Sequence, residues 1–281
     1  MTTARFTLVD VFTDVPFAGN QLGVFTDARG LTGAQMQALA RELNFSECTF
    51  VLPPETTGQA RMRIFTPAEE LPFAGHPTLG TAWVLAAPLQ RDVIELECGQ
   101  GIVPVTLERD ASGRLTFGRM TQPLPTVGPY GDAEAALAAL GVGGSLLPVE
   151  VCDNGVRHVY VRVSSADEVA GIEPDMVALA RLGTLSFSVF AADGPRVMSR
   201  VFVPGAGVPE DPATGSAAGP LAVHLARHEA VPWGEQVEIS QGAQVGRPST
   251  LFARAEGGPD GVTAVEVGGS AVIVGRGELV I

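Results

Sequence analysis

The sequence contains no lysine, because all eighteen of its basic residues are arginine. Three kinds of site need a lysine side chain at a fixed place: a pyridoxal-phosphate Schiff base, a lysine-imine aldolase and a Walker A phosphate loop. The absence of lysine excludes all three.

Cysteine is also scarce. Cys48, Cys98 and Cys152 are widely separated and lack paired spacing. This arrangement argues against a disulfide framework or a cysteine-rich zinc site. We expect most of these side chains to be small buried groups.

Long apolar runs and basic runs are missing as well. No segment approaches the roughly 20 consecutive apolar residues that span a bilayer, and the first residues show no secretory signal pattern. The formal net charge of −13 would repel nucleic-acid phosphates and anionic lipids. We therefore expect a cytoplasmic protein whose partner is a small molecule, with no nucleic-acid or membrane partner.

What the sequence does contain is a series of short apolar segments separated by Gly and Pro. Met36, Leu39, Ala40 and Leu43 recur at helical spacing after Thr32, a suitable N-cap. A second helix is expected after the GHP turn, and a third near residues 174–182. Alternating patterns predict strands at residues 6–12, 22–25, 48–54, 60–67, 93–100, 102–110, 158–163, 186–192 and 198–204.

The second half of the chain repeats the first. Three blocks occur twice in the same order and at nearly the same offset, which indicates an internal duplication with strand, turn, helix and strand in each copy. A Pro- and Gly-rich stretch near residue 120 separates the copies. The blocks are IFTP, GHPTLG and VIELECGQGIVPV in the first copy, and VFVP, TGSAAGPLAVHLARH and VEISQGAQVGRPS in the second.

Both copies place a turn directly before a helix. A helix N-terminus presents unpaired N–H groups and the positive end of the helix dipole, which favour a carboxylate. Pro77 suits a first-turn position, where a missing N–H costs nothing. If the two copies face one another across a cleft, both turns could bind a single small acidic metabolite.

Five blocks together resemble the phenazine-biosynthesis PhzF-like family: DVFTDVPFAGNQLGVF, NFSECTF, RIFTPAEELPFAGHPTLGTA, RVFVPGAGVPEDPATGSAAGPL and ISQGAQVGRPS. The match runs from Asp10 to Pro248. The resemblance implies a diaminopimelate-epimerase-like α+β fold with two similar domains by internal duplication, each a curved, mostly antiparallel sheet around a central helix. It also implies a cofactor-independent isomerase, commonly a homodimer, in which a glutamate moves a proton between carbons of an acidic substrate.

The resemblance assigns domains and site residues to this chain. The expected domains are residues 1–118, with the C-terminal strand 270–281 packing back on them, and residues 119–269. An interdomain cleft is expected to hold the site. The catalytic residues would be Glu47, His76 and Asp211, and the substrate-binding residues would be Asn20, Gly75, Gly215 and Ser216.

The sequence departs from the family pattern at two places. The block that usually reads GNP-x-AV is GNQLGV here, and Cys48 stands where a hydroxyl residue is commoner. The departures concern the shape of the substrate pocket, so they do not identify the substrate. The sequence also does not show whether the net reaction is a double-bond shift, an epimerisation or a tautomerisation.

Two other functions have to be weighed against the isomerase. His76, Asp211 and Ser216 have the composition of a hydrolase triad, but Thr214 stands where the GxSxG elbow needs glycine. A metabolite-binding protein without turnover is the other alternative. The related two-thiol racemases are excluded because neither turn contains cysteine, and Cys98 lies after the helix rather than in a turn.

His224 and His228 have the i, i+4 spacing of some zinc sites. The residues between them are LAR, without the glutamate of HExxH, and the pair lies at the far end of its helix from the turn. We expect a solvated helix end, with no metal and no cofactor. Asp10 and Asp14 are expected to be strand-end or loop charges.

Overall fold

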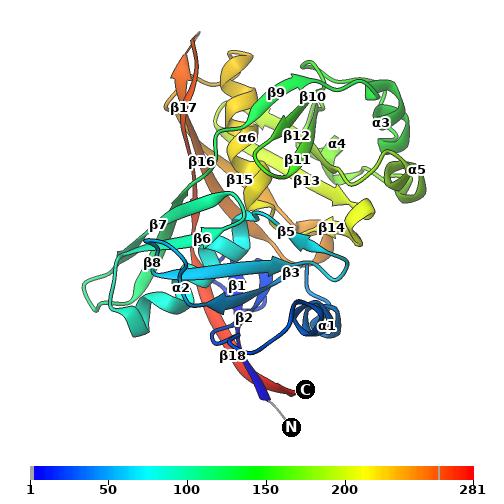
Figure 1. Ribbon diagram of the computed structural model, residues 1–281. Coiled ribbons are helices and arrows are strands. Elements are labelled where there is room, and N and C mark those ends of the chain that lie inside the picture. Colours follow the sequence, from blue (N-terminus) through cyan, green and yellow to red (C-terminus); the bar gives the residue numbers. More distant parts are fainter. Residues whose placement is uncertain (1–2, 259) are drawn as a thin grey trace. The chain divides into compact units, whose positions relative to one another are not determined.

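The computed structural model in Figure 1 describes residues 3–258 and 260–281. Its residues form two compact units. The first unit comprises the chain up to Thr121 together with Gly268–Ile281, and the second comprises Gln122–Val267.

The first unit is built mainly from strands. The helix expected after Thr32 is confirmed, and its capping box joins the Thr32 and Gln35 side chains to each other's backbone N–H. The elements are β1 (Thr3–Val11), β2 (Asn20–Phe25), α1 (Gly33–Leu43), β3 (Glu47–Leu52), β4 (Ala60–Phe65), β5 (Glu70–Leu71), α2 (Gly75–Leu89), β6 (Val93–Cys98), β7 (Gly101–Arg109), β8 (Leu115–Thr121) and β18 (Ala271–Val280).

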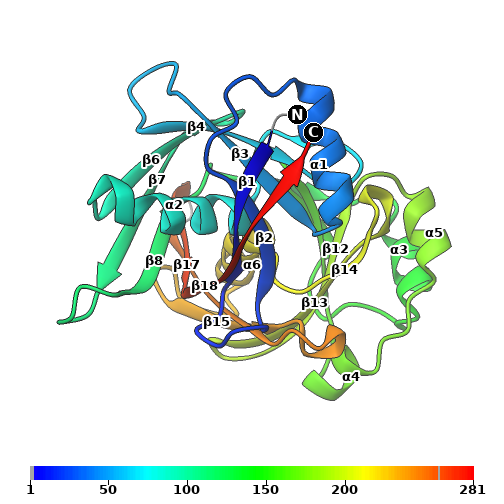
Figure 2. The same ribbon diagram turned by 90° about the horizontal axis from the view of Figure 1, so that it is seen from below.

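Strand pairing in this unit follows the order β18, β1, β2, β3, β4, β6, β7, β8. The β2–β3 and β4–β6 pairs are parallel and the other pairs are antiparallel, so the sheet is mostly antiparallel. The first and last strands of the chain, β1 and β18, lie side by side (Figure 2). The C-terminal strand therefore belongs to the same sheet as the N-terminal one.

Helix α2 is the central helix of the first unit. All residues from Gly75 to Ala86 are buried, so the helix is enclosed on every side rather than amphipathic. It contacts β1, β2, β3, β6, β7 and β8. Gly80 permits the closest approach, because a Cβ there would lie 2.6 Å from the Leu22 side chain and 2.8 Å from that of Val11.

The second unit repeats this arrangement. Its elements are β9 (Thr126–Pro129), α3 (Ala133–Leu140), β10 (Glu150–Asp153), β11 (Arg157–Arg162), α4 (Ala166–Ala170), α5 (Met176–Arg181), β12 (Ser186–Asp193), β13 (Arg196–Val203), η1 (Pro204–Ala206), β14 (Val208–Asp211), α6 (Gly215–Arg227), β15 (Gln236–Gln241), η2 (Ala243–Val245), β16 (Ser249–Gly258) and β17 (Gly261–Gly269).

The topology of the two units supports the duplication in detail. In the first unit β2 and β3 are parallel, β3 and β4 antiparallel, β4 and β6 parallel, and α2 precedes β6. In the second, β11 and β12 are parallel, β12 and β13 antiparallel, β13 and β15 parallel, and α6 precedes β15. A short strand, β5 or β14, leads into the central helix of each unit.

Some elements were not predicted from the sequence. Helix α3 and the short helix α4 bury only a narrow apolar side, and their residues pack with α5 against β11 and β12 in one apolar cluster. Strand β8 ends directly before the Pro- and Gly-rich stretch, and β9 lies within it, where proline and glycine obscure the strand pattern.

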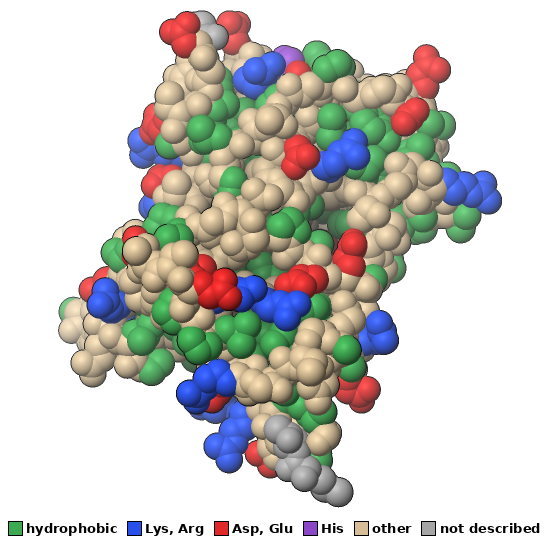
Figure 3. Space-filling model, viewed as in Figure 1, with side chains coloured by type: hydrophobic (Ala, Val, Ile, Leu, Met, Phe, Trp, Pro, Cys, Tyr) green, Lys and Arg blue, Asp and Glu red, His purple; other side chains and the backbone are tan. Residues whose placement is uncertain are grey.

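The surface carries mixed charge. On the face shown in Figure 3, acidic and arginine side chains lie close together, and arginine forms no extended patch there. Among the described residues, no helix has the length and apolar character needed to cross a membrane.

Candidate active site

Glu47 is the first residue of β3 and lies on the face of that strand that packs against α2. Strand alternation places Thr49 on the same face, and the Thr49 hydroxyl lies 2.8 Å from the hydroxyl of Thr81 in α2. Cys48 and Phe50 point to the other face, into an apolar cluster with α1. The Glu47 side chain is only 15% exposed, so its carboxyl group is largely sheltered from solvent.

His76 is the second residue of α2 and is buried. Its Nδ1 atom lies 3.2 Å from Asn20 Nδ2, at the start of β2. An amide NH₂ can only donate, so Nδ1 is the acceptor and the proton of the neutral ring lies on Nε2. Nε2 is also buried, and it has no hydrogen-bond partner within the described part of the chain.

The Glu47 and His76 side chains are neighbours. Glu47 Oε2 lies 3.6 Å from His76 Nδ1, which is too long for a hydrogen bond. Burial lowers the pKa of His76 from 6.5 to about 3, because the imidazolium loses its hydration, and this effect outweighs the opposing contact with the Gln21 backbone. At neutral pH the site therefore combines a carboxyl group with an uncharged imidazole.

The loop between β1 and β2 leads to Asn20 and has a constrained backbone. Phe12 and Phe17 both have positive φ, at 64° and 69°, a conformation uncommon outside glycine. The Asp10 carboxylate accepts a hydrogen bond from the Phe17 N–H at 2.7 Å. Asp10 is a strand-end residue, as expected from the sequence, but it is buried and part of the support for this loop.

The N-terminus of α2 has no side-chain cap. Its N-cap residue is Ala74, with Gly75 as the first helical residue and Pro77 in the first turn. The first N–H groups of a helix lack intrahelical acceptors, and Pro77 contributes none. Gly75 and His76 therefore present the first N–H groups of this helix, as the anion-site hypothesis requires.

In the second unit, Asp211 ends β14 and is buried. Its Oδ2 accepts a 2.6 Å hydrogen bond from the Thr214 hydroxyl. Gln241 Nε2 donates to the Asp211 carbonyl at 2.7 Å and to Thr214 Oγ1 at 3.0 Å. The N-cap residue of α6 is Thr214, and among the residues that the structure describes no side chain caps the first N–H groups of this helix.

Three buried side chains that were not predicted from the sequence stabilise the start of α6. Pro220 cannot donate to the carbonyl of Ser216 four residues earlier, and Asn154 Nδ2 donates to that carbonyl instead, at 2.9 Å. Gln122 Nε2 donates to Gly215 O at 2.8 Å, and the Tyr160 hydroxyl donates to Ala217 O at 2.7 Å. Pro220 was the one signal in the sequence for these contacts. A proline inside a helix leaves the carbonyl four residues earlier without its backbone donor, so another group has to donate to that carbonyl.

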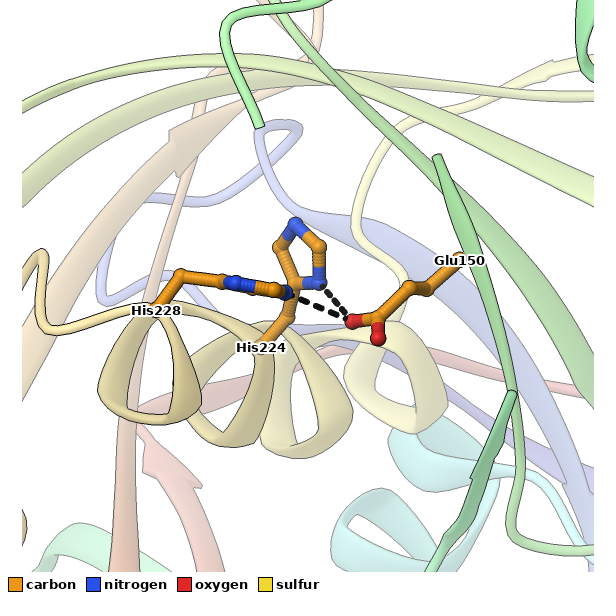
Figure 4. A group of neighbouring side chains, drawn as sticks. All are labelled: Glu150, His224 and His228. Carbon is orange, nitrogen blue, oxygen red and sulfur yellow. Dashed lines mark hydrogen bonds and ion pairs between the residues drawn. The ribbon is translucent and has the colours of Figure 1, made fainter. Parts of the chain in front are cut away.

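The expectation of a solvated helix end at His224 and His228 is wrong. His224 is fully buried, and Glu150 Oε2 lies 2.9 Å both from His224 Nδ1 and from His228 Nε2 (Figure 4). Hydrogen bonding to these imidazoles, chiefly to His224, lowers the pKa of Glu150 to about 2. The sequence could not reveal this cluster, because Glu150 lies on β10, far from the helix along the chain.

The cysteines have the role expected for most of them. Cys48 and Cys152 are fully buried, and desolvation raises the pKa of each thiol to about 12. Cys98 is half-buried and its pKa is also raised by burial. Thiols with raised pKa values stay protonated at neutral pH, and a protonated thiol is a poor nucleophile.

The predicted site residues thus form two groups. Asn20, Glu47, Gly75 and His76 come together in the first unit around the start of α2. Asp211, Gly215 and Ser216 come together in the second unit around the start of α6. That both groups share one interdomain cleft stays a prediction.

Comparison with solved structures shows what kind of protein has this fold. A phenazine biosynthesis protein of the PhzF family from Bacillus anthracis superposes with a TM-score of 0.85 and 26% identity over 100% of both chains. A hydroxyproline epimerase from Agrobacterium vitis has a TM-score of 0.67 and 11% identity, over 99% of this chain and 91% of the other, which is a likeness of fold alone. The chain is therefore a duplicated α+β protein with a diaminopimelate-epimerase-like fold, as its sequence predicts.

Sequence comparison then identifies the family. Residues 9–277 match the PhzC-PhzF family, described as phenazine biosynthesis-like protein, and the chain belongs to this family. The trans-2,3-dihydro-3-hydroxyanthranilate isomerase of Pseudomonas aeruginosa is 48% identical over 273 residues, or 97% of this chain and 98% of the relative. The protein is an isomerase.

Proposed function

We propose that this isomerase moves a proton between two carbons of a small cyclic carboxylate, with Glu47 as the acid/base group and no cofactor. The observation that carries the proposal is the Glu47 carboxyl beside a neutral His76 whose Nδ1 is bound to Asn20. A sheltered carboxyl group can accept a proton from one carbon and return it to another. The uncharged His76 imidazole lies next to the Glu47 carboxyl group and forms no ion pair with it.

The first substrate to test is trans-2,3-dihydro-3-hydroxyanthranilate, the compound in the name of the Pseudomonas aeruginosa relative. Its two ring double bonds are conjugated with the carboxylate, so the C3–H bond is activated. Removing that proton spreads the negative charge over the diene to C1 and the carboxylate. Returning the proton to C1 completes the isomerisation and leaves an enol at C3, which converts to the ketone.

One carboxyl group suffices for both proton transfers. C1 and C3 of this substrate flank the same ring carbon, so a base on one face of the ring reaches both. Glu47 removes the C3 proton, exchanges it with solvent and then delivers a proton to C1. The charge that develops in the transition state spreads over the ring carbons and the substrate carboxylate, and donors to the carboxylate stabilise it.

The other residues supply these donors in our proposal. His76 Nε2–H donates to a polar group of the substrate, since Asn20 holds its proton on that atom. Backbone N–H groups of Gly75, Gly215 and Ser216 bind the substrate carboxylate, and Asp211 orients its polar substituents. This assignment assumes that both turns contact one substrate molecule, as the resemblance implies.

The departures from the family pattern do not lie on the face of the sheet that carries the acid/base pair. Strand alternation places Asn20 and Leu22 on the α2 face of β2, and Gln21 and Gly23 on the opposite face. A Cβ at Gly23 would lie 2.9 Å from the Leu43 side chain and 3.3 Å from Cys48 Sγ. Glycine at 23 therefore makes room for the larger Cys48 under the sheet. This supports a substrate like that of the relative.

The hydrolase alternative is disfavoured by the hydrogen bond to His76. In a Ser-His-Asp triad the imidazole Nδ1–H donates to a carboxylate. Here Nδ1 accepts from the Asn20 amide, and Asp211 accepts from Thr214. The tautomer is the opposite of the one a triad needs.

Incubation with trans-2,3-dihydro-3-hydroxyanthranilate in deuterated water tests the proposal. We expect loss of the conjugated diene and incorporation of deuterium at C1, detected by NMR, and neither in E47Q. If this compound is inert but other cyclic amino acids of a panel exchange protons, the substrate is wrong and the mechanism stands. If no compound exchanges, the proposed function fails. The homodimer and the cytoplasmic location remain parts of the proposal, the former tested by sedimentation.

A further inference from the structure

Glu150, His224 and His228 form a cluster of potential metal ligands that the proposed proton transfer does not use. One ligand atom from each residue lies within 4.8 Å of the others. We propose that these three side chains bind a divalent transition-metal ion of the zinc class.

The donor set is one that zinc uses. Two imidazole nitrogens and one carboxylate oxygen, with a water molecule in the fourth position, are a common arrangement around zinc. His224 lies in the last turn of α6 and His228 is the C-cap residue of that helix, and Glu150 approaches them from β10, so that all three side chains converge (Figure 4). Imidazole ligands favour zinc, copper or nickel over magnesium or calcium, which prefer oxygen.

Burial and packing hold the ligands in place. His224 is fully buried, its ring stacks on Tyr160 at a centroid distance of 5.5 Å, and the edge contact with Phe190 is at 5.9 Å. The Glu150 side chain is 11% exposed. The His228 side chain is 21% exposed, which leaves a route for an ion and a position for water.

Metal binding requires a change of tautomer. In the structure both imidazoles are within hydrogen-bond distance of Glu150 Oε2, whereas metal ligation uses a nitrogen lone pair. The proton of each neutral ring can move to its other nitrogen, which is Nε2 in His224 and Nδ1 in His228. Each ring keeps its proton on the other nitrogen, so neither ring releases a proton when the ion binds. The ion takes the place of the two hydrogen bonds between the imidazoles and Glu150.

The cluster must also contract. Ligand atoms around a tetrahedral zinc ion are about 3.4 Å apart, given bonds of about 2.1 Å, and this is less than the 4.8 Å span of the cluster. His228 is the most exposed of the three ligands, with a side chain that is 21% exposed, and has the freedom to rotate inward. Arg227 opposes the ion, because its Nη2 lies 3.8 Å from Glu150 Oε1, but its side chain is 43% exposed and can turn towards solvent.

The bound ion would link α6 to β10. The same helix begins with Gly215 and Ser216, so the ion would stabilise the element that carries the second turn. We therefore expect the ion to raise thermal stability and to leave the proton chemistry to Glu47.

Titration of the EDTA-treated full-length protein with Zn²⁺, followed by calorimetry and thermal unfolding, tests the proposal. We expect one ion per chain and a higher Tm. E150Q and H228Q should each weaken binding at least about 100-fold, because each removes one of three ligands. E229Q, which changes an exposed acid next to His228, is the matched control and should bind as the unmodified protein does.

A second measurement protects the test against misfolded variants. Co²⁺ bound to the unmodified protein should give the visible absorption bands of a tetrahedral site with nitrogen ligands, and Zn²⁺ should displace it. The proposal is overturned if the unmodified protein shows no such bands and no 1:1 binding, or if folded H228Q binds Zn²⁺ normally. Binding that is lost in H76N but kept in H228Q would place the ion elsewhere and overturn it too.

Discussion

The side-chain amide of Asn20 donates a hydrogen bond to Nδ1 of His76 across 3.2 Å, and this contact fixes the tautomer of a buried imidazole. The two residues are 56 positions apart in the sequence and meet because β2 lies along the N-terminal part of α2. With Nδ1 engaged, the proton lies on Nε2. The chemistry proposed for the site depends on this arrangement, and the predictions below test it.

Replacing Glu47 by glutamine should abolish proton transfer and leave binding nearly intact. The amide has almost the same shape but cannot accept a proton at neutral pH, so kcat should fall by at least about 10³, within the range of general-base losses. Ligand affinity should stay within about tenfold. E69Q, which alters an exposed acid in the loop between β4 and β5, is the control. If E47Q turned over substrate at the rate of the unmodified protein, Glu47 would have no part in the mechanism.

Replacing Asn20 by aspartate should reverse the tautomer of His76. A carboxylate accepts the Nδ1–H that an amide cannot, and it also stabilises the imidazolium. We expect the pKa of His76 to rise from its depressed value and kcat to fall about 10²-fold, with a smaller effect on KM. Nitrogen NMR of the imidazole reports the tautomer directly. An unchanged tautomer combined with lost activity would mean that Asn20 acts in another way.

Asn154 and Pro220 should show a compensating double-mutant effect. N154L leaves the Ser216 carbonyl without its side-chain donor, and Pro220 cannot replace it. An unsatisfied buried carbonyl costs about 1–3 kcal/mol. P220A restores the missing N–H, so N154L should cost less in a P220A background. Urea unfolding of the four proteins measures the coupling, and strictly additive effects would refute this account.

Stability should fall on acidification below about pH 6.5. Burial lowers the pKa of His76 and of His158 from 6.5 to about 3. Between these values the unfolded chain binds a proton on each ring and the folded chain does not, so lowering the pH favours unfolding. At about pH 5 each residue should cost roughly 2 kcal/mol. Urea midpoints from about pH 7 to 5 measure the slope, and a flat profile would contradict the burial of these rings.

Proton transfer should survive removal of metal ions. Glu47 and His76 need no ion for the proposed chemistry, so dialysis against EDTA should leave kcat within about twofold when measured below the unfolding temperature. If the activity disappears and zinc restores it, the mechanism proposed for Glu47 is wrong. If only the Tm falls, the result agrees with a stabilising site at Glu150.

The sequence by itself predicted the duplicated fold, because its evidence is local and repeated. Alternating apolar residues predict β3 and β13, and the capping pattern from Thr32 predicts α1. The NFSECTF block predicted Glu47, and the GHPTLG and TGSAAG turns predicted His76 and Ser216, all through the family resemblance. Helix α3 was missed because a short alanine-rich segment carries a weak signal.

Only the tertiary structure decided the electrostatics of the sites. Whether Glu150 meets His224, whether Asn154 replaces the donor that Pro220 lacks, and whether Asn20 sets the tautomer of His76 all depend on contacts between segments distant in the chain. Burial determined the protonation state of His76. Its imidazole has an ordinary pKa in the unfolded chain, and burial in the folded protein lowers that pKa to about 3. Residue types and spacing determine the backbone pattern, whereas protonation and hydrogen-bond partners depend on which side chains the folded sheets bring together and shield from water.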